Sequence, residues 1–184
     1  DLWNAMMSQA PTIAPVSIQG LMDVTPETTG SWRTTMFNRA MARQLTQLFQ
    51  HVDIPKELEM NDYSSTDFWQ GDKNRRKFKF ECVSPMLRWM KYLDGGTHFC
   101  HFDQGFVYNN DNYRSLMSIV IYLSTNKTGA TRIIDDKQGH LPVWDRNHND
   151  WTRETRPDEV LYESYPVAGS MLIFSHRIAH DVQK

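Results

Sequence analysis

The stretch SLMSIVIYLSTNKTGATRIID, residues 115–135, consists of two short apolar runs with a polar segment between them. Residues 115–124 and 130–135 are rich in isoleucine, leucine and valine, and β-branched residues favour strands. The segment TNKTG between them combines asparagine, lysine and glycine, which is typical of a turn. The stretch therefore predicts two short strands separated by a turn.

The same pattern recurs on both sides of this stretch. Short runs rich in β-branched or aromatic residues occupy 78–83, 86–93 and 170–175, and the turn clusters DGG, NNDN and VAG lie between runs. Many short strands separated by turns indicate a β-sandwich or a jelly roll. We find no internal repeat in the chain.

One helix is predicted before the strands, within residues 27–55. Apolar residues recur at three- and four-residue spacing from Met36 to Val52, which gives one apolar stripe. Ser31 or a nearby threonine is expected to cap the start, and Pro55 prevents continuation. We expect one domain over 1–184, with 1–60 as helical support and 61–184 as the jelly-roll core.

Composition limits the class of protein. With 184 residues, 40% hydrophobic and 12% aromatic, the chain is long and apolar enough for one folded domain. A net charge of −2 argues against a nucleic-acid partner, because phosphate binders usually carry a basic excess. No apolar run is long enough to span a membrane. The two cysteines, Cys82 and Cys100, and the lack of a recognisable signal peptide favour a reduced, cytoplasmic location.

The segment HFCHFD, residues 98–103, contains a candidate metal site. In a strand, residues two apart point to the same face, so His101 and Asp103 would direct an imidazole and a carboxylate to one point. A further histidine would complete the two-histidine, one-carboxylate set of non-haem Fe(II) oxygenases. The alternative is a surface histidine beside an aspartate in a turn. An ideal strand places His98 on the face opposite His101, outside the ligand set.

Three segments resemble the prolyl 4-hydroxylase-like group of the 2-oxoglutarate/Fe(II)-dependent dioxygenases. They are LRWMKYLDGGTHFCHFD (87–103), RSLMSIVIYLSTNKTGATRI (114–133) and YPVAGSMLIFSHRIAHDVQK (165–184). The similarity covers roughly residues 85–184 and implies a mainly β fold with supporting helices, a double-stranded β-helix (jelly roll, cupin-like). It also implies Fe(II), 2-oxoglutarate and O2 as cofactors, with ascorbate as a further candidate.

The resemblance also implies roles for individual residues. His101, Asp103 and His180 correspond to the iron ligands, with His176 as the rival for the third position, at the end of the same strand as His180. Tyr92 and Thr131 correspond to residues that contact 2-oxoglutarate, and Arg114 to an arginine near the substrate entrance. The implied reaction is hydroxylation of an unactivated C–H bond, with a prolyl residue in a protein or peptide as the expected substrate.

Two departures from the family pattern bear on this expectation. The segment GAT replaces the usual Gly-Gly-x-Thr turn. The family's basic residue for the far carboxylate of 2-oxoglutarate lies well beyond the distal histidine, whereas the chain ends at Lys184, four residues after His180. Four strand residues span roughly 13 Å, so we do not assign this task to Lys184. We expect the chain to be a fragment that lacks part of its C-terminal region.

The alternatives are a nucleic-acid or small-molecule oxygenase of the same superfamily and a non-catalytic jelly-roll binding module. The basic run NRRKFK (74–79) is expected to be a solvated strand edge, with a peptide or nucleic-acid contact as the alternative. The polar segment 144–159 is expected to be a long loop. Oligomeric state is not predicted by any feature of the sequence.

Overall fold

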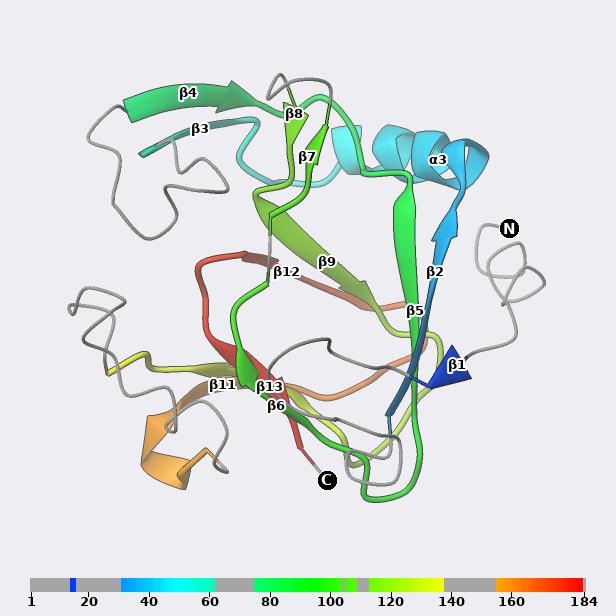
Figure 1. Cartoon of the computed structure of the whole chain (residues 1–184), viewed down its shortest axis with the longest axis vertical. Helices are drawn as coiled ribbons and strands as arrows, with labels where there is room; N and C mark the ends of the chain where they lie inside the picture. Colours follow the sequence, from blue (N-terminus) through cyan, green and yellow to red (C-terminus); the bar gives the residue numbers. More distant parts are fainter. Residues whose placement is uncertain are drawn as a thin grey trace.

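A computed structural model describes residues 14–15, 31–61, 75–103, 105–108, 113–137 and 155–183. The described residues are mainly β with one α-helix (Figure 1). The elements are, in chain order, β1 (Ala14–Pro15), β2 (Ser31–Phe37), α3 (Arg39–Gln50), β3 (Glu57–Asn61), β4 (Arg75–Lys79), β5 (Met86–Tyr92), β6 (His98–His101), β7 (Val107–Tyr108), β8 (Tyr113–Arg114), β9 (Met117–Ile121), β10 (Thr131–Ile134), the 3-10 helix η3 (Pro157–Glu159), β11 (Val160–Ser164), β12 (Met171–Ser175) and β13 (His180–Val182).

All strand pairs in the described residues are antiparallel. The largest sheet has the order β11-β10-β13-β6, and a second has the order β1-β2-β5. Three two-stranded sheets are formed by β12-β9, β3-β4 and β7-β8. Strands far apart in the sequence are therefore neighbours, as β6 and β13 are in Figure 1. The expected mainly β class is confirmed.

The helix begins later than the sequence predicted. Residues 31–37 form β2, which pairs with β5 over its whole length, and α3 starts at Arg39. Asn38 is the N-cap, and its side chain accepts a hydrogen bond from the backbone N–H of Met41 at 2.9 Å. The prediction of a cap at Ser31 was wrong, because the pairing with β5 outweighs the apolar spacing that continues into this segment.

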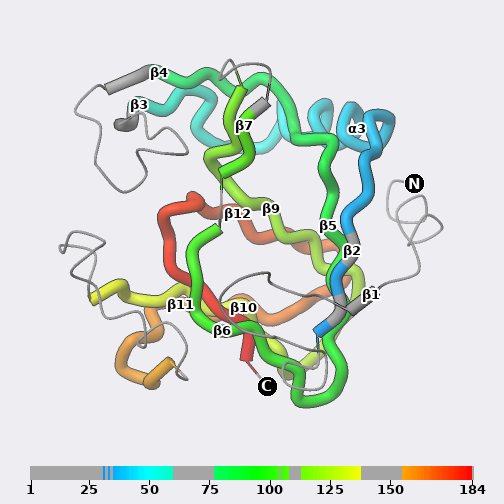
Figure 2. The backbone as a smooth tube through the Cα atoms, in the orientation of Figure 1, coloured from blue at the N-terminus to red at the C-terminus, as the bar shows by residue number. Residues whose placement is uncertain are grey.

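The apolar core lies between α3 and the strands. Met41, Leu45 and Phe49 of α3 are buried against Trp89 of β5. Partly buried residues of β9 and β12 complete this layer; they are Ile119, Ile121, Met171 and Ile173. The helix thus covers one face of β5, β9 and β12, and Figure 2 shows these strands below it. The other face of β9 and β12 is free to meet the four-stranded sheet.

The predicted strands at 86–93, 115–124, 130–135 and 170–175 are confirmed as β5, β9, β10 and β12. The basic run at 74–79 forms β4, so its strand precedes the predicted 78–83. Strand β11 was missed. Most of the predicted loop at 144–159 lies outside the described residues, and its last residues include η3. Cys82 and Cys100 are both free thiols. Among the described helices, none could span a membrane.

Candidate metal centre

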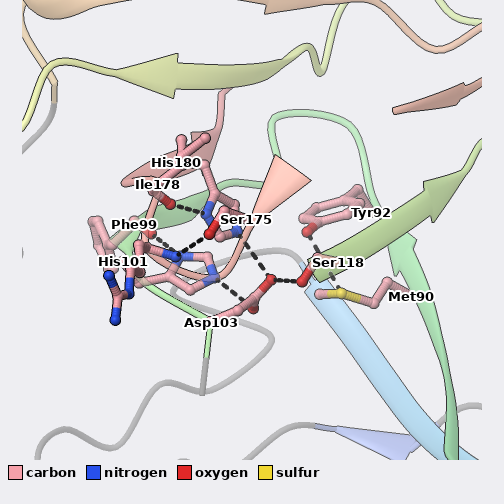
Figure 3. Close-up of polar contacts among 10 residues, drawn as sticks. Met90, Tyr92, Phe99, His101, Asp103, Ser118, Ser175, Ile178 and His180 are labelled. Atoms are coloured by element: carbon pink, nitrogen blue, oxygen red, sulfur yellow. Dashed lines mark hydrogen bonds and ion pairs between the residues drawn. The ribbon is translucent and has the colours of Figure 1, made fainter. Parts of the chain in front are cut away.

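Three side chains from two adjacent strands meet at one point. His101 is the last residue of β6, His180 is the first residue of β13, and the two are direct register partners. Asp103 follows β6 by two residues and lies beside both imidazoles (Figure 3). One potential ligand atom from each side chain lies within 4.8 Å of the other two. The sheet pairing therefore brings together the three residues that the sequence singled out.

Both imidazoles are held with Nε2 towards Asp103. The Nδ1 atom of His101 lies 2.7 Å from the carbonyl oxygen of Phe99, and Nδ1 of His180 lies 3.0 Å from that of Ile178. A carbonyl oxygen only accepts hydrogen bonds, so Nδ1 of each neutral ring carries the proton and Nε2 has a free lone pair. The Nε2 atoms of His101 and His180 are 3.9 Å and 3.7 Å from the carboxylate oxygens of Asp103.

The carboxylate of Asp103 is kept ionised. Burial acts to raise its pKa, but a hydrogen bond from the hydroxyl of Ser118 and the neighbouring His180 and His101 together lower it below the usual value. Ser118 belongs to β9, so the second sheet fixes the orientation of this carboxylate. Sequence reasoning missed Ser118, although a single hydroxyl within the apolar run MSIVI was a usable signal.

The arrangement fits a small divalent cation. It offers two neutral imidazole nitrogens and one carboxylate, all from one side, and this donor set is typical of open non-haem Fe(II) sites. The rings of His101 and His180 lie 4.2 Å apart, and Phe174 packs on His180 with ring centroids 4.5 Å apart. Burial and the nearby His180 lower the pKa of His101, so its nitrogen is unprotonated at neutral pH.

His98 lies on the same side as His101, not on the opposite face as predicted. The pairing of β13 with β6 joins His180 to His101 and Val182 to His98, so β6 has one residue more than β13 between the two pairs. Such a bulge reverses the alternation of side chains. The ring of His98 stacks on His101 with centroids 4.2 Å apart and an interplanar angle of 24°. Burial lowers the pKa of His98 to about 3.

His176 lies outside the three-residue cluster. It follows β12, whereas His180 opens β13, so the prediction that both histidines end one strand was wrong. The backbone N–H of His176 donates to the carbonyl of Leu116, and its buried Nδ1 has no hydrogen-bond partner. The described structure thus favours His180 over His176 as the third ligand.

A buried ion pair lies next to His180 on the other face of the sheet. Asp181 accepts two hydrogen bonds from Arg132 of β10, at 2.8 Å and 2.6 Å, and one from the hydroxyl of Thr155 at 2.6 Å. All three residues are buried. Because His180 and Asp181 are consecutive strand residues, this network fixes the backbone that carries His180. Sequence reasoning did not identify it, since Arg132 and Asp181 are 49 residues apart.

The other predicted site residues differ in position. Tyr92 lies at the end of β5, and burial, opposed in part by Arg33 and reinforced by Asp103, raises the pKa of its hydroxyl. Thr131 is buried in β10 two residues before Ile133, the register partner of His180, so it shares the face of His180. Arg114 lies in β8 opposite Val107, and its role at the substrate entrance stays a prediction.

Comparisons with protein-family models, with curated proteins and with solved structures found no match to this chain.

Proposed function

We propose that the protein is a 2-oxoglutarate- and Fe(II)-dependent oxygenase that hydroxylates an unactivated C–H bond. The observation that carries the proposal is the cluster of His101, Asp103 and His180, with both Nε2 atoms and one carboxylate directed to a common point. The resemblance of residues 85–184 to the prolyl 4-hydroxylase-like group supports it. In this proposal, β11-β10-β13-β6 and β12-β9 belong to the two halves of a double-stranded β-helix.

The residues of the chain have separate tasks in this reaction. The three ligands would hold Fe(II) from one side and leave positions for 2-oxoglutarate and O2. When bound, Fe(II) and 2-oxoglutarate supply the oxidising power: 2-oxoglutarate is converted to succinate and CO2, and one oxygen atom enters the substrate C–H bond. The carbonyls of Phe99 and Ile178 keep the Nδ1 protons in place, and Ser118 holds Asp103 ionised and oriented.

The proposed substrate is a prolyl residue in a protein or peptide, with ascorbate as a candidate supporting reductant. The net charge of −2 gives no support to a nucleic-acid substrate. A small-molecule substrate and a non-catalytic binding role are the other outcomes that the experiment separates.

The test is a turnover assay. The protein is incubated with Fe(II), 2-oxoglutarate, O2 and a panel of proline-rich peptides, and succinate and peptide mass are measured. We expect succinate to form together with a peptide that gains one oxygen atom. Asp103→Ala should abolish both signals, and Asp53→Ala, which removes an exposed carboxylate after α3, should leave them unchanged. Succinate without a modified peptide would indicate another substrate class, and absence of succinate would contradict the proposed activity.

A further inference from the structure

Two arginines lie on the face of the β2-β5 pair that looks away from α3. The register places Arg33 opposite Met90 and Thr35 opposite Arg88. Cross-strand partners share a face, and so do residues two apart. Arg33, Arg88, Met90 and Tyr92 therefore share one face. The alternate residues Leu87 and Trp89 pack against α3, so this shared face looks towards the interior between the sheets.

This face borders the metal centre. Tyr92 lies close enough to Asp103 for its charge to affect the pKa of the tyrosine, after the larger effects of burial and Arg33. Burial is the main cause that lowers the pKa of His98 and His176, and the charge of Arg33 contributes at His98 and that of Arg88 at His176. The two guanidinium groups thus lie on the side from which the cluster is approached.

Neither arginine has a counter-charge. Within the described ranges, no carboxylate lies at ion-pair distance from Arg33 or Arg88. Arg33 is half-buried, and burial and then the positive charge of Arg88 lower its pKa, with Tyr92 acting in the opposite direction. Two like charges directed at the same space repel each other unless an anion lies between them. Met90, between them on the face, is still 39% exposed, so space remains for a ligand.

We propose that Arg33 and Arg88 bind a carboxylate of an organic acid whose other end lies at His101, Asp103 and His180. This inference rests on the proposed function, in which the acid is 2-oxoglutarate and the bound group is its far carboxylate. A guanidinium is a planar donor that matches a carboxylate with two parallel hydrogen bonds. Arg33 and Arg88 lie on β2 and β5, before the metal ligands in the chain, whereas the resemblance leads to a basic residue after His180.

The experiment compares two acids that differ at the far end only. Calorimetric titration with Mn(II) alone first establishes metal binding. The Mn(II)-loaded protein is then titrated with 2-oxoglutarate and with 2-oxobutyrate, which retains the keto acid end and lacks the far carboxylate. The variants are Arg33→Gln, Arg88→Gln and the double variant, and Arg43→Gln on the exposed side of α3 is the matched control.

We expect the wild type and Arg43→Gln to bind 2-oxoglutarate at least about tenfold more tightly than 2-oxobutyrate, as charge-assisted hydrogen bonds predict. Each single arginine variant should reduce that preference, and the double variant should remove it, with Mn(II) binding and 2-oxobutyrate affinity unchanged. A wild type without preference, or arginine variants that keep the full preference, would overturn the inference while metal binding stands. Absence of Mn(II) binding in the wild type would overturn the proposed function and this inference together.

Discussion

Replacing Asp181 by asparagine should destabilise the protein strongly, although the side chain keeps its size. Asp181 accepts two hydrogen bonds from Arg132 and one from Thr155, and the ion-pair side chains are only 7% and 4% exposed. In Asp181→Asn the guanidinium of Arg132 stays buried without a counter-charge. Removing one partner of a buried ion pair costs about 3–5 kcal/mol.

Urea-induced unfolding followed by circular dichroism measures this loss, since the free energy of unfolding falls linearly with urea concentration. The double variant Arg132→Met/Asp181→Leu should recover much of the loss, because an apolar pair removes the uncompensated charge. Asp135→Asn, which breaks the exposed contact with Lys137, should leave the midpoint unchanged. A loss below about 1 kcal/mol in Asp181→Asn would refute the reasoning, because it would mean that the pair is worth no more than a surface ion pair.

Three further changes test the neighbourhood of the cluster. Ser118→Ala removes the hydrogen bond that orients Asp103 and should weaken Mn(II) binding about 10–100-fold, measured by calorimetry, while an unchanged affinity would dismiss Ser118 from the site. Tyr92→Phe should raise the dissociation constant of 2-oxoglutarate roughly ten- to a hundredfold without affecting metal binding, since a hydrogen bond to a charged group is lost; equal affinities would show that the hydroxyl meets water instead. In the metal-free protein, burial lowers the pKa of His98 from 6.5 to about 3, so its contribution to stability is present above about pH 6.5 and lost as the pH falls towards 3. His98→Gln should therefore flatten the decline of the unfolding free energy by up to about 1.4 kcal/mol per pH unit, and urea titrations between neutral pH and mildly acidic pH should show parallel curves if this is wrong.

The sequence predicted best those elements whose signal is local. Strands β5, β9, β10 and β12 combine β-branched or aromatic residues with clear turns, and the structure contains each of them. Strand β11 gave no such signal because it is an edge strand with Leu161 and Tyr162 largely exposed. The start of α3 was misplaced because the apolar spacing at Met36 also suits a strand that pairs with β5.

The site was predictable where sequence spacing determines geometry. His101 and Asp103 are two residues apart, and the structure places them at one cluster with His180. The position of His98 depends on a bulge that only the pairing of β6 with β13 creates. The neighbours from other strands, such as Ser118, depend on long-range register, which no local pattern encodes.

The pairing of distant strands also explains why the two arginines were not noticed in the sequence. Arg33 was assigned to a helix, and only the register of β2 with β5 places it on the face of Arg88. Side-chain alternation in β5 then separates Arg88 and Tyr92 from the residues that pack on α3. Such a surface arises from two strands together and has no signature in either one.

The most direct test of the account is the binding of Fe(II) to the metal-free protein by anaerobic equilibrium dialysis, with the ligand set probed at the two competing histidines. His180→Gln and His176→Gln are compared with the wild type, and circular dichroism checks that each variant is folded. The account predicts one tightly bound ion per chain in the wild type and in His176→Gln, and loss of that binding in His180→Gln. A wild type that binds no ion, or a folded His180→Gln variant that binds Fe(II) as the wild type does, would contradict it.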